Sequence, residues 1–227
     1  MRATVHLLRL AALTALAGLA AAQVPAVSSF TGATAFGSVN NTNQTIGFSF
    51  TANSNIVVTG LGVWDASTGD PLTQNHQVGL WDAGGNLLAS GTVLTNSPLT
   101  GSWRYVTISP VTLNAGQTYF AGSAITNPYT DTFSRVDLPG GTVTTNSLIT
   151  VGLATANGSG GGFSFPNITD AAALARLGPN LIVQAGPPTV PTAVPISPLA
   201  LGIIGVGLTL MAAALIGLRR PVSGGAL

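Results

Sequence analysis

The chain has 227 residues, of which 46% are hydrophobic and only 6% are charged, and it contains no cysteine, lysine or glutamate. Soluble domains usually carry about 25% charged residues, so this composition is typical of a membrane-linked or a β-rich extracellular protein. The lack of cysteine excludes disulfides, thiolate metal sites and cysteine nucleophiles. Four of the seven arginines lie near the two ends of the chain. The region between them contains the other three arginines and all six aspartates. The middle of the chain therefore has a net charge of −3 and no basic footprint for nucleic acid.

Residues 1–22 are predicted to be a secretory signal peptide. Two arginines precede an apolar run that closes on the small residues Ala20 and Ala22. This order of charged, apolar and small-residue regions is typical of a cleavable leader, and the apolar run is too short to span a bilayer of about 30 Å. We therefore expect export, with a mature chain that begins at Gln23.

A second apolar segment, residues 196–218, is predicted to be a transmembrane helix or part of a sorting signal. No charged residue lies between Arg176 and Arg219, and at about 1.5 Å per residue a helix of this length crosses the hydrocarbon core. Arg219 and Arg220 follow directly. The positive-inside rule then predicts a short cytoplasmic tail, residues 219–227, with the preceding chain outside.

The proline-rich residues 187–195 are predicted to form a stiff, extended spacer. Together with the apolar segment and the arginine pair, Val190, Pro191 and Thr192 resemble the C-terminal sorting signals of bacterial surface proteins, the PEP-CTERM type and its IPTL-CTERM relative. The chain lacks the Val-Pro-Glu-Pro of the first type, and its Val-Pro-Thr is closer to the second. The resemblance implies an exosortase-like processing enzyme and a role in biofilm-forming Gram-negative bacteria. Two outcomes are expected: a membrane anchor with the domain outside the cytoplasm, or release to the cell surface or medium after processing.

Residues 23–186 are predicted to form one mainly-β domain, a single β-sandwich of jelly-roll type. Short apolar or alternating runs recur between glycine, asparagine, proline and serine, a pattern typical of sandwiches. The predicted strands cover residues 45–50, 56–64, 77–81, 87–94, 103–108, 118–125 and 180–184, with a β-favouring stretch at 142–151. Residues 82–86 are predicted to form a hairpin loop, and residues 170–177 a short helix capped by Asp170.

The middle region also resembles a known family. The sequences of residues 48–50, 57–65, 76–82, 87–90, 103–106 and 113–119 together are similar to an uncharacterised bacterial domain of unknown function that occurs in many PEP-CTERM proteins. The resemblance implies a β-rich fold. It carries over no catalytic residue, because none is established for that family.

A Gly-aliphatic-Trp-Asp-Ala sequence occurs twice, at Trp64-Asp65 and at Trp81-Asp82. The favoured interpretation is structural: each tryptophan ends a strand against the core, and each aspartate opens the next turn through its side-chain oxygen. The alternative is functional, with Trp64, Trp81 and Trp103 forming a stacking surface for sugars.

Two further candidates for a metal site are weak. Asp65 and Asp70 lie in a short loop that also contains hydroxyl side chains. Carboxylate and hydroxyl oxygens are ligands that calcium can bind. The loop lacks the EF-hand pattern, so an ordinary polar turn is favoured and calcium is the only cofactor left open. His76 is the only histidine outside the leader. A single histidine makes no multi-histidine metal site, so we expect a hydrogen-bonded strand residue.

We expect no enzymatic activity, because the exported region has no glutamate, lysine or cysteine, only one histidine and no G-x-S-x-G elbow. Residue counts alone leave a Ser/His/Asp triad open. The predicted function is that of an exported structural or adhesive protein of the cell envelope or extracellular matrix, with the membrane, an exosortase-like enzyme and polysaccharide as partners. The alternatives are a carbohydrate-binding module, which needs an exposed tryptophan or tyrosine beside polar groups, and a polysaccharide-cleaving enzyme, which needs two carboxylates roughly 5 to 9.5 Å apart.

Overall fold

The computed structural model describes residues 22–36, 43–65, 71–126 and 131–187. All of them belong to the first of two compact units, Met1–Pro188, whereas the second unit, Thr189–Leu227, lies outside the described residues. The predicted leader, spacer, apolar segment and tail therefore fall almost wholly outside the described part of the chain. Among the residues that are described, no helix is both long and apolar enough to cross a membrane.

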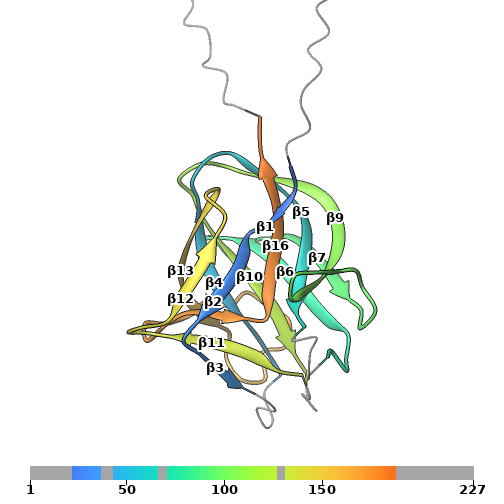
Figure 1. The fold of residues 1–227 in the computed structure, drawn as a ribbon, viewed down its shortest axis with the longest axis vertical. Coiled ribbons are helices and arrows are strands. Elements are labelled where there is room, and N and C mark those ends of the chain that lie inside the picture. Colours follow the sequence, from blue (N-terminus) through green and yellow to red (C-terminus); the bar gives the residue numbers. More distant parts are fainter. Residues whose placement is uncertain (1–21, 37–42, 66–70, 127–130, 188–227) are drawn as a thin grey trace, which may run out of the picture. The chain divides into compact units, whose positions relative to one another are not determined.

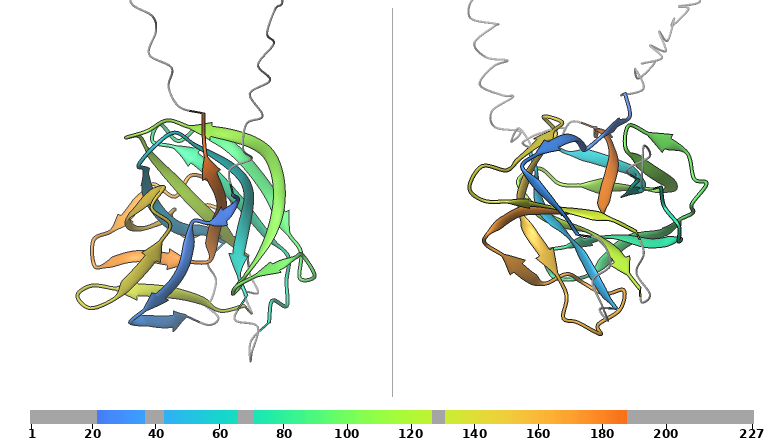
Figure 2. Two further views of the ribbon diagram at one scale, coloured as in Figure 1. Left: turned by 45° about the horizontal axis from the view of Figure 1, so that its top comes forward. Right: turned by 60° about the horizontal axis from the view of Figure 1, so that its bottom comes forward.

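The described residues form sixteen strands in four sheets and no helix. Figures 1 and 2 show how these strands are arranged. Every strand pair is antiparallel. The five-stranded sheet contains, in order, β1 (Val24–Pro25), β16 (Pro179–Ala185), β5 (Ile56–Trp64), β9 (Trp103–Leu113) and β8 (Leu99–Thr100). The six-stranded sheet contains β14 (Ile168–Asp170), β13 (Ile149–Ala156), β4 (Gln44–Ala52), β10 (Thr118–Ile125), β6 (His76–Asp82) and β7 (Leu87–Val93). A three-stranded sheet contains β15 (Ala173–Leu177), β11 (Phe133–Asp137) and β3 (Ala33–Phe36). A two-stranded sheet contains β12 (Thr142–Thr145) and β2 (Val27–Thr31).

The main core contains side chains from both large sheets. Successive side chains of a strand point to opposite faces, so β4 contributes Phe48 and Phe50 while β9 contributes Trp103 and Tyr105. The prediction of a mainly-β, sandwich-like domain is confirmed.

Strands β4 and β10 approach each other closely at Gly47. A Cβ atom at this position would lie 1.8 Å from the carbonyl oxygen of Ala121. That oxygen belongs to the backbone of a paired strand, so it has little freedom to move away. The pairing of β4 with β10 in this register therefore requires a residue without a side chain at position 47.

Most predicted strands are confirmed, and one predicted helix is wrong. Strands β5 and β10 cover the predicted residues 56–64 and 118–125. Residues 170–177, predicted as a helix, instead complete β14 and form β15, in which Ala173, Ala175 and Leu177 are buried. The reason is that β15 pairs with β11, and this long-range pairing outweighs the helix propensity of an alanine- and leucine-rich segment.

The described chain begins and ends at the same end of the domain. Val24 in β1 pairs with Val183 in β16, and Ala185 pairs with Ile56 at the start of β5. Trp64 is the last residue of β5, so it lies at the opposite end of a nine-residue strand, a span of about 27 Å. Figure 1 shows β3 and β11 at this opposite end as well.

Candidate functional site

The three tryptophans have three different environments. Trp103 is 2% exposed and belongs to the main core. Trp81 is 3% exposed but lies outside that core, because its neighbour Leu80 points inward and the Trp81 ring therefore occupies the outer side of the six-stranded sheet. Trp64 is half-buried and packs against the core. The structure brings Trp64 and Trp103 together and places Trp81 elsewhere.

Trp81 is covered by the loop of residues 157–167. The ring of Phe163 lies against Trp81 with 5.2 Å between the ring centroids. A Cβ atom at Gly79 would lie 2.5 Å from the Trp81 ring, so a glycine at this position leaves room for the indole. Trp81 is buried, but it lies outside the main core, where the sequence predicted that it would pack, because a loop provides the cover.

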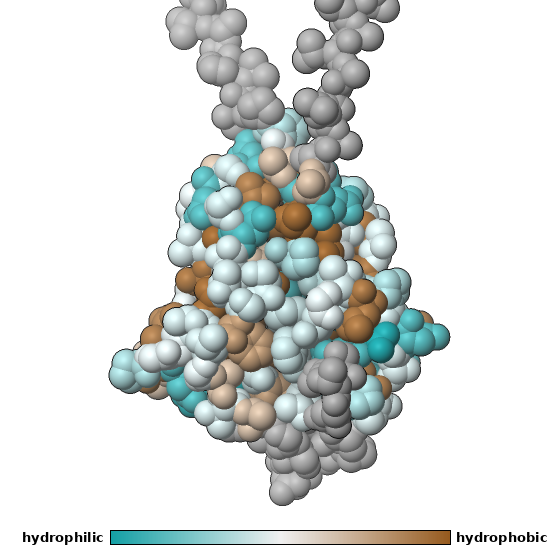
Figure 3. Space-filling view, viewed as in Figure 1, coloured by the Kyte–Doolittle hydropathy of each residue, from teal (hydrophilic) through white to brown (hydrophobic). Residues whose placement is uncertain are grey.

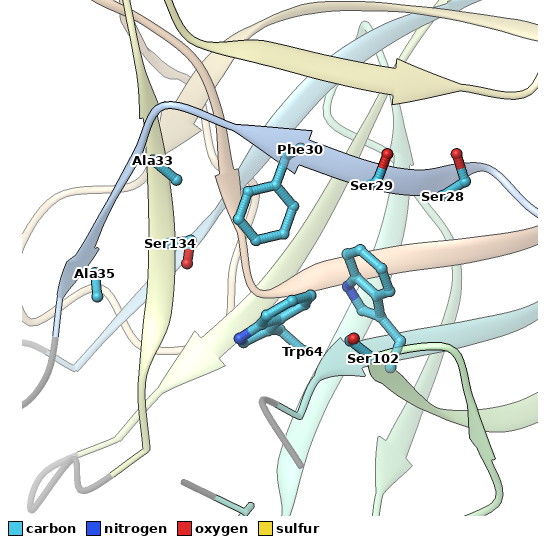
Figure 4. Close-up of a pocket in the computed structure, with 9 residues that line it drawn as sticks. Ser28, Ser29, Phe30, Ala33, Ala35, Trp64, Ser102 and Ser134 are labelled. Carbon is cyan, nitrogen blue, oxygen red and sulfur yellow. The ribbon is translucent and has the colours of Figure 1, made fainter. Parts of the chain in front are cut away.

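Trp64 lies in an open pocket of about 320 Å³ between the five-stranded sheet and the two small sheets. Three aromatic rings meet there at steep angles: the centroids of Phe30 and Trp64 are 4.8 Å apart, and those of Trp64 and Trp103 are 4.7 Å apart. Such edge-to-face contacts fix the orientation of each ring. In Figure 4 the rings of Phe30 and Trp64 lie beside each other, with Ala33 and Ala35 on the strand next to them. The pocket is lined by Ser28, Ser29, Phe30, Ala33, Ala35, Trp64, Ser102, Trp103 and Ser134.

The polar groups of this pocket, which we call the Trp64 pocket, are serine hydroxyls and an indole nitrogen. Ser28 donates its hydroxyl to the carbonyl oxygen of Thr144, at 3.2 Å. No hydrogen bond is formed by the hydroxyls of Ser29, Ser102 and Ser134 within the described part of the chain. Figure 4 shows the Trp64 nitrogen at the end of the ring that is nearest to Ser134 and Ala35. These groups offer hydrogen bonds without any charge.

The charged side chains near the Trp64 pocket are engaged with one another on other faces. On β11, Arg135 forms ion pairs with Asp137 and Asp170. Arg135 and Asp137 alternate with Ser134, so they point to the opposite face of the strand from the pocket. The largest influence on the pKa of Asp170 is burial, which raises it, but hydrogen bonds from Arg135 and from a backbone N–H outweigh burial and leave this pKa lowered.

Only one of the two predicted calcium ligands, Asp65, lies in the described residues. Asp65 is fully buried and forms an ion pair with Arg104 on β9. Arg104 also donates to the carbonyl oxygen of Ser97 at 2.8 Å. Asp70 lies outside the described residues, and the described residues contain no cluster of three or more histidine, cysteine, aspartate or glutamate side chains suited to a metal. Asp65 thus joins β5 to β9, and the turn that it was predicted to open, residues 66–70, lies outside the described residues.

His76 is a hydrogen-bonded strand residue, as predicted. It is 2% exposed, and its Nε2 lies 2.8 Å from Oδ2 of Asp131 while its Nδ1 lies 3.1 Å from the carbonyl oxygen of Ala124. Because a carbonyl oxygen only accepts, Nδ1 carries a proton. Asp131 also accepts from the hydroxyl and the backbone N–H of Thr73 and from the backbone N–H of Gln74. Burial alone would raise the pKa of Asp131, but these hydrogen bonds outweigh burial and leave it lowered.

Asp82 opens the hairpin between β6 and β7, as predicted. Its Oδ1 accepts from the backbone N–H groups of Gly84 and Asn86, each at 2.9 Å, and its Oδ2 accepts from the Asn86 side chain at 2.8 Å. The Asn86 side chain is the main cause of the lowered pKa of Asp82, with the two backbone groups adding to it. The carboxylate therefore serves the turn.

Sequence reasoning identified Trp64 and Trp103 but not the other walls of the pocket. Phe30 and Ser134 come from strands that were not predicted, and they are far from Trp64 in the chain. One feature of the sequence could have indicated the pocket: the small residues Ala33 and Ala35 alternate along β3. Both line the pocket, and Ala35 pairs with Ser134 on β11. The sorting-motif residues Val190, Pro191, Thr192, Arg219 and Arg220 lie outside the described residues.

Fold and pocket together define a mainly-β domain of antiparallel sheets with an uncharged aromatic pocket at one end. The family described as domain of unknown function DUF4082 matches residues 31–173, which is more than half of the chain. The chain therefore belongs to this family, and the resemblance to an uncharacterised domain of unknown function is confirmed. The match includes Trp64 and Ser134 and stops short of Phe30. No curated protein matches the chain.

Proposed function

We propose that the chain is an exported, non-enzymatic protein of the cell envelope or extracellular matrix, with a structural or adhesive role. The observation that carries this proposal is that each aspartate of the described region is engaged in a structural contact. The contacts are Asp65 with Arg104, Asp82 with Asn86, Asp131 with Thr73 and His76, and Asp137 and Asp170 with Arg135. Both ring nitrogens of His76 are also occupied. A general base needs a free lone pair within reach of a substrate proton, and these groups are instead committed to holding the fold.

The ends of the chain support export and anchoring. Residues 1–22 have the composition of a cleavable leader, and residues 196–218 with the following arginine pair have that of a membrane-spanning segment whose tail stays in the cytoplasm. The likeness to PEP-CTERM and IPTL-CTERM sorting signals favours an exosortase-like enzyme as a processing partner. Because β1 and the end of β16 pair with each other, the described chain begins and ends at one end of the domain, and Trp64 lies at the opposite end.

The surface of the domain suits this role. Over the face seen in Figure 3, hydrophobic residues form small separate groups among hydrophilic ones. The large exposed apolar side chains are Leu87, Leu94, Leu99, Leu138 and Ile168. Charged side chains are few in the whole chain, so its polar surface consists chiefly of uncharged hydroxyl and amide groups, which hydrogen-bond to polysaccharide without depending on salt.

Fractionation and protease accessibility test the proposal. Cells that produce the whole chain are compared with cells that produce a variant ending at residue 189. We expect the whole chain in the envelope fraction, digestible by protease added to intact cells, and the shortened variant in the periplasm or the medium. Recovery of the whole chain in the cytoplasm, protected from protease, would contradict the proposal.

A carbohydrate-binding module is the second candidate function, and Trp64 favours it. A sugar-binding surface needs an exposed aromatic ring beside polar groups, and Trp64 is half-buried in a pocket with three serine hydroxyls that have no partner within the described residues. Trp81 and Trp103 are buried and support the structural reading instead. The two functions are compatible, because an adhesive matrix protein needs a surface that holds polysaccharide.

A further inference from the structure

We propose that the Trp64 pocket binds a single uncharged sugar residue, either free or within a polysaccharide. The sugar ring stacks on Phe30 and Trp64, and its hydroxyls pair with Ser134 and with the indole N–H of Trp64. This inference rests on the carbohydrate-binding candidate and adds to it the site, the class of sugar and the groups that recognise it.

The size and walls of the pocket fit one ring. Its volume of about 320 Å³ is at the lower end of the range of small-molecule sites, about 300 to 1,000 Å³. Phe30 and Trp64 supply apolar faces, and the carbon-bound hydrogens on the face of a sugar ring suit such surfaces. Ala33 and Ala35 leave the space open, because a larger side chain on this face of β3 would occupy it.

Ser134 provides an observation that is independent of the aromatic rings. Its side chain is only 7% exposed, yet its hydroxyl makes no hydrogen bond within the described residues. The Ser134 hydroxyl is not one of the fully buried polar atoms of the described residues that lack a partner, so solvent reaches it in the open pocket and a ligand there can replace that solvent. In Figure 4 this hydroxyl lies beside Phe30 and on the side of the Trp64 nitrogen. A hydroxyl group of a ligand in the pocket would pair with both, as acceptor from Trp64 and as donor or acceptor to Ser134.

The absence of charged side chains from the lining of the pocket favours an uncharged ligand. None of the residues that line it carries a charge, and Asp65 and Arg104 are paired with each other nearby. A uronic acid or a phosphorylated sugar would lose water from its anionic group on entry and find no cation to replace that water. Neutral hexoses and N-acetylated hexosamines carry no such cost.

The position of the pocket suits a ligand outside the cell. Strand β5 begins at Ile56 and ends at Trp64. Ile56 pairs with Ala185, which lies close to the C-terminal end of the described chain. The pocket therefore lies at the end of the domain opposite to Val24 and Ala185. A ligand in the pocket is therefore bound far from the residues at which the described chain begins and ends.

Calorimetric titration of the whole chain tests the proposal, in a detergent that has no sugar headgroup. The uncharged probes are hexasaccharides of glucose, mannose, galactose and N-acetylglucosamine, and the acidic probes are hexasaccharides of galacturonate and guluronate. We expect binding of at least one uncharged probe and none of the acidic ones. Trp64→Ala should weaken that binding at least about tenfold, and Ser134→Ala about threefold to tenfold.

Two further variants separate binding from folding. Ala35→Leu adds bulk to the pocket without removing a core contact, so it should abolish binding at an unchanged melting temperature. Trp81→Phe alters a tryptophan outside the pocket and should bind as the parent does. Binding that survives both Trp64→Ala and Ala35→Leu would overturn the proposed site and leave the carbohydrate-binding candidate standing. Preference for an acidic probe would overturn the class of ligand, and binding of none of the probes would overturn the site and that candidate together.

Discussion

The burial of Trp81 predicts a large loss of stability on Trp81→Ala. The ring is 3% exposed, packs on Phe163 and lies over Gly79, which has no side chain to fill the space left behind. Replacing a buried tryptophan with alanine costs about 3 to 5 kcal/mol, out of a total of about 5 to 15 kcal/mol for a typical domain. In a domain of this size, each kcal/mol lowers the melting temperature by about 2 to 4 °C. We therefore expect Trp81→Ala to melt about 6 to 20 °C below the parent.

Differential scanning calorimetry of the whole chain measures this effect, with Trp64→Ala as the comparison. Trp64 is only half-buried, so its loss should cost less than the loss of Trp81. The loop of residues 157–167 should also become more sensitive to limited proteolysis in Trp81→Ala, because Phe163 loses its partner. If Trp81→Ala melted within a degree or so of the parent, the assignment of Trp81 to a structural role would be wrong.

Three more predictions concern the sheet contact, acid stability and membrane insertion. Gly47→Ala should lower stability by about 3 kcal/mol or more, measured by urea unfolding, because its Cβ would meet a backbone oxygen at 1.8 Å, whereas Gly158→Ala has open space and should be close to neutral. The lowered pKa of Asp131 means that its contribution to stability is present above its unfolded pKa of about 3.9 and is lost as the pH falls below it. The parent should accordingly lose stability more steeply than Asp131→Asn in melting curves between pH 5 and pH 2. Gly207→Arg should weaken membrane insertion by about 2.5 to 3.5 kcal/mol, and an unchanged share of the protein in the membrane fraction would argue against residues 196–218 as the anchor.

The sequence predicted the strands whose pattern is local and missed those that depend on distant partners. Alternating apolar residues and flanking turn residues are enough to define β5 and β10. Strand β15 looked like a helix because alanine and leucine favour helices, and only its pairing with β11 determines the extended form. Strands β2, β3 and β11 are only four or five residues long and contain many small or polar residues, so they carry little periodic signal.

The candidate site was only partly predictable for the same reason. Trp64 stood out as an aromatic residue at a strand end, but its role depends on Phe30 and Ser134, which join it through strand pairings remote in sequence. Trp81 shared the same local sequence as Trp64 and has a different environment. The difference arises from Phe163, in a loop whose position the sequence does not reveal.

The intact mass of the native protein, combined with the fraction in which it is found, tests the central claim of export most directly. We expect an envelope-bound or released protein that begins at Gln23 and is therefore lighter than the 22.6 kDa of the full chain by at least the mass of residues 1–22. A further loss of residues near the C-terminus would indicate processing of the sorting signal, and retention of those residues would indicate a permanent anchor. A cytoplasmic protein that keeps Met1 and the full mass would contradict the account.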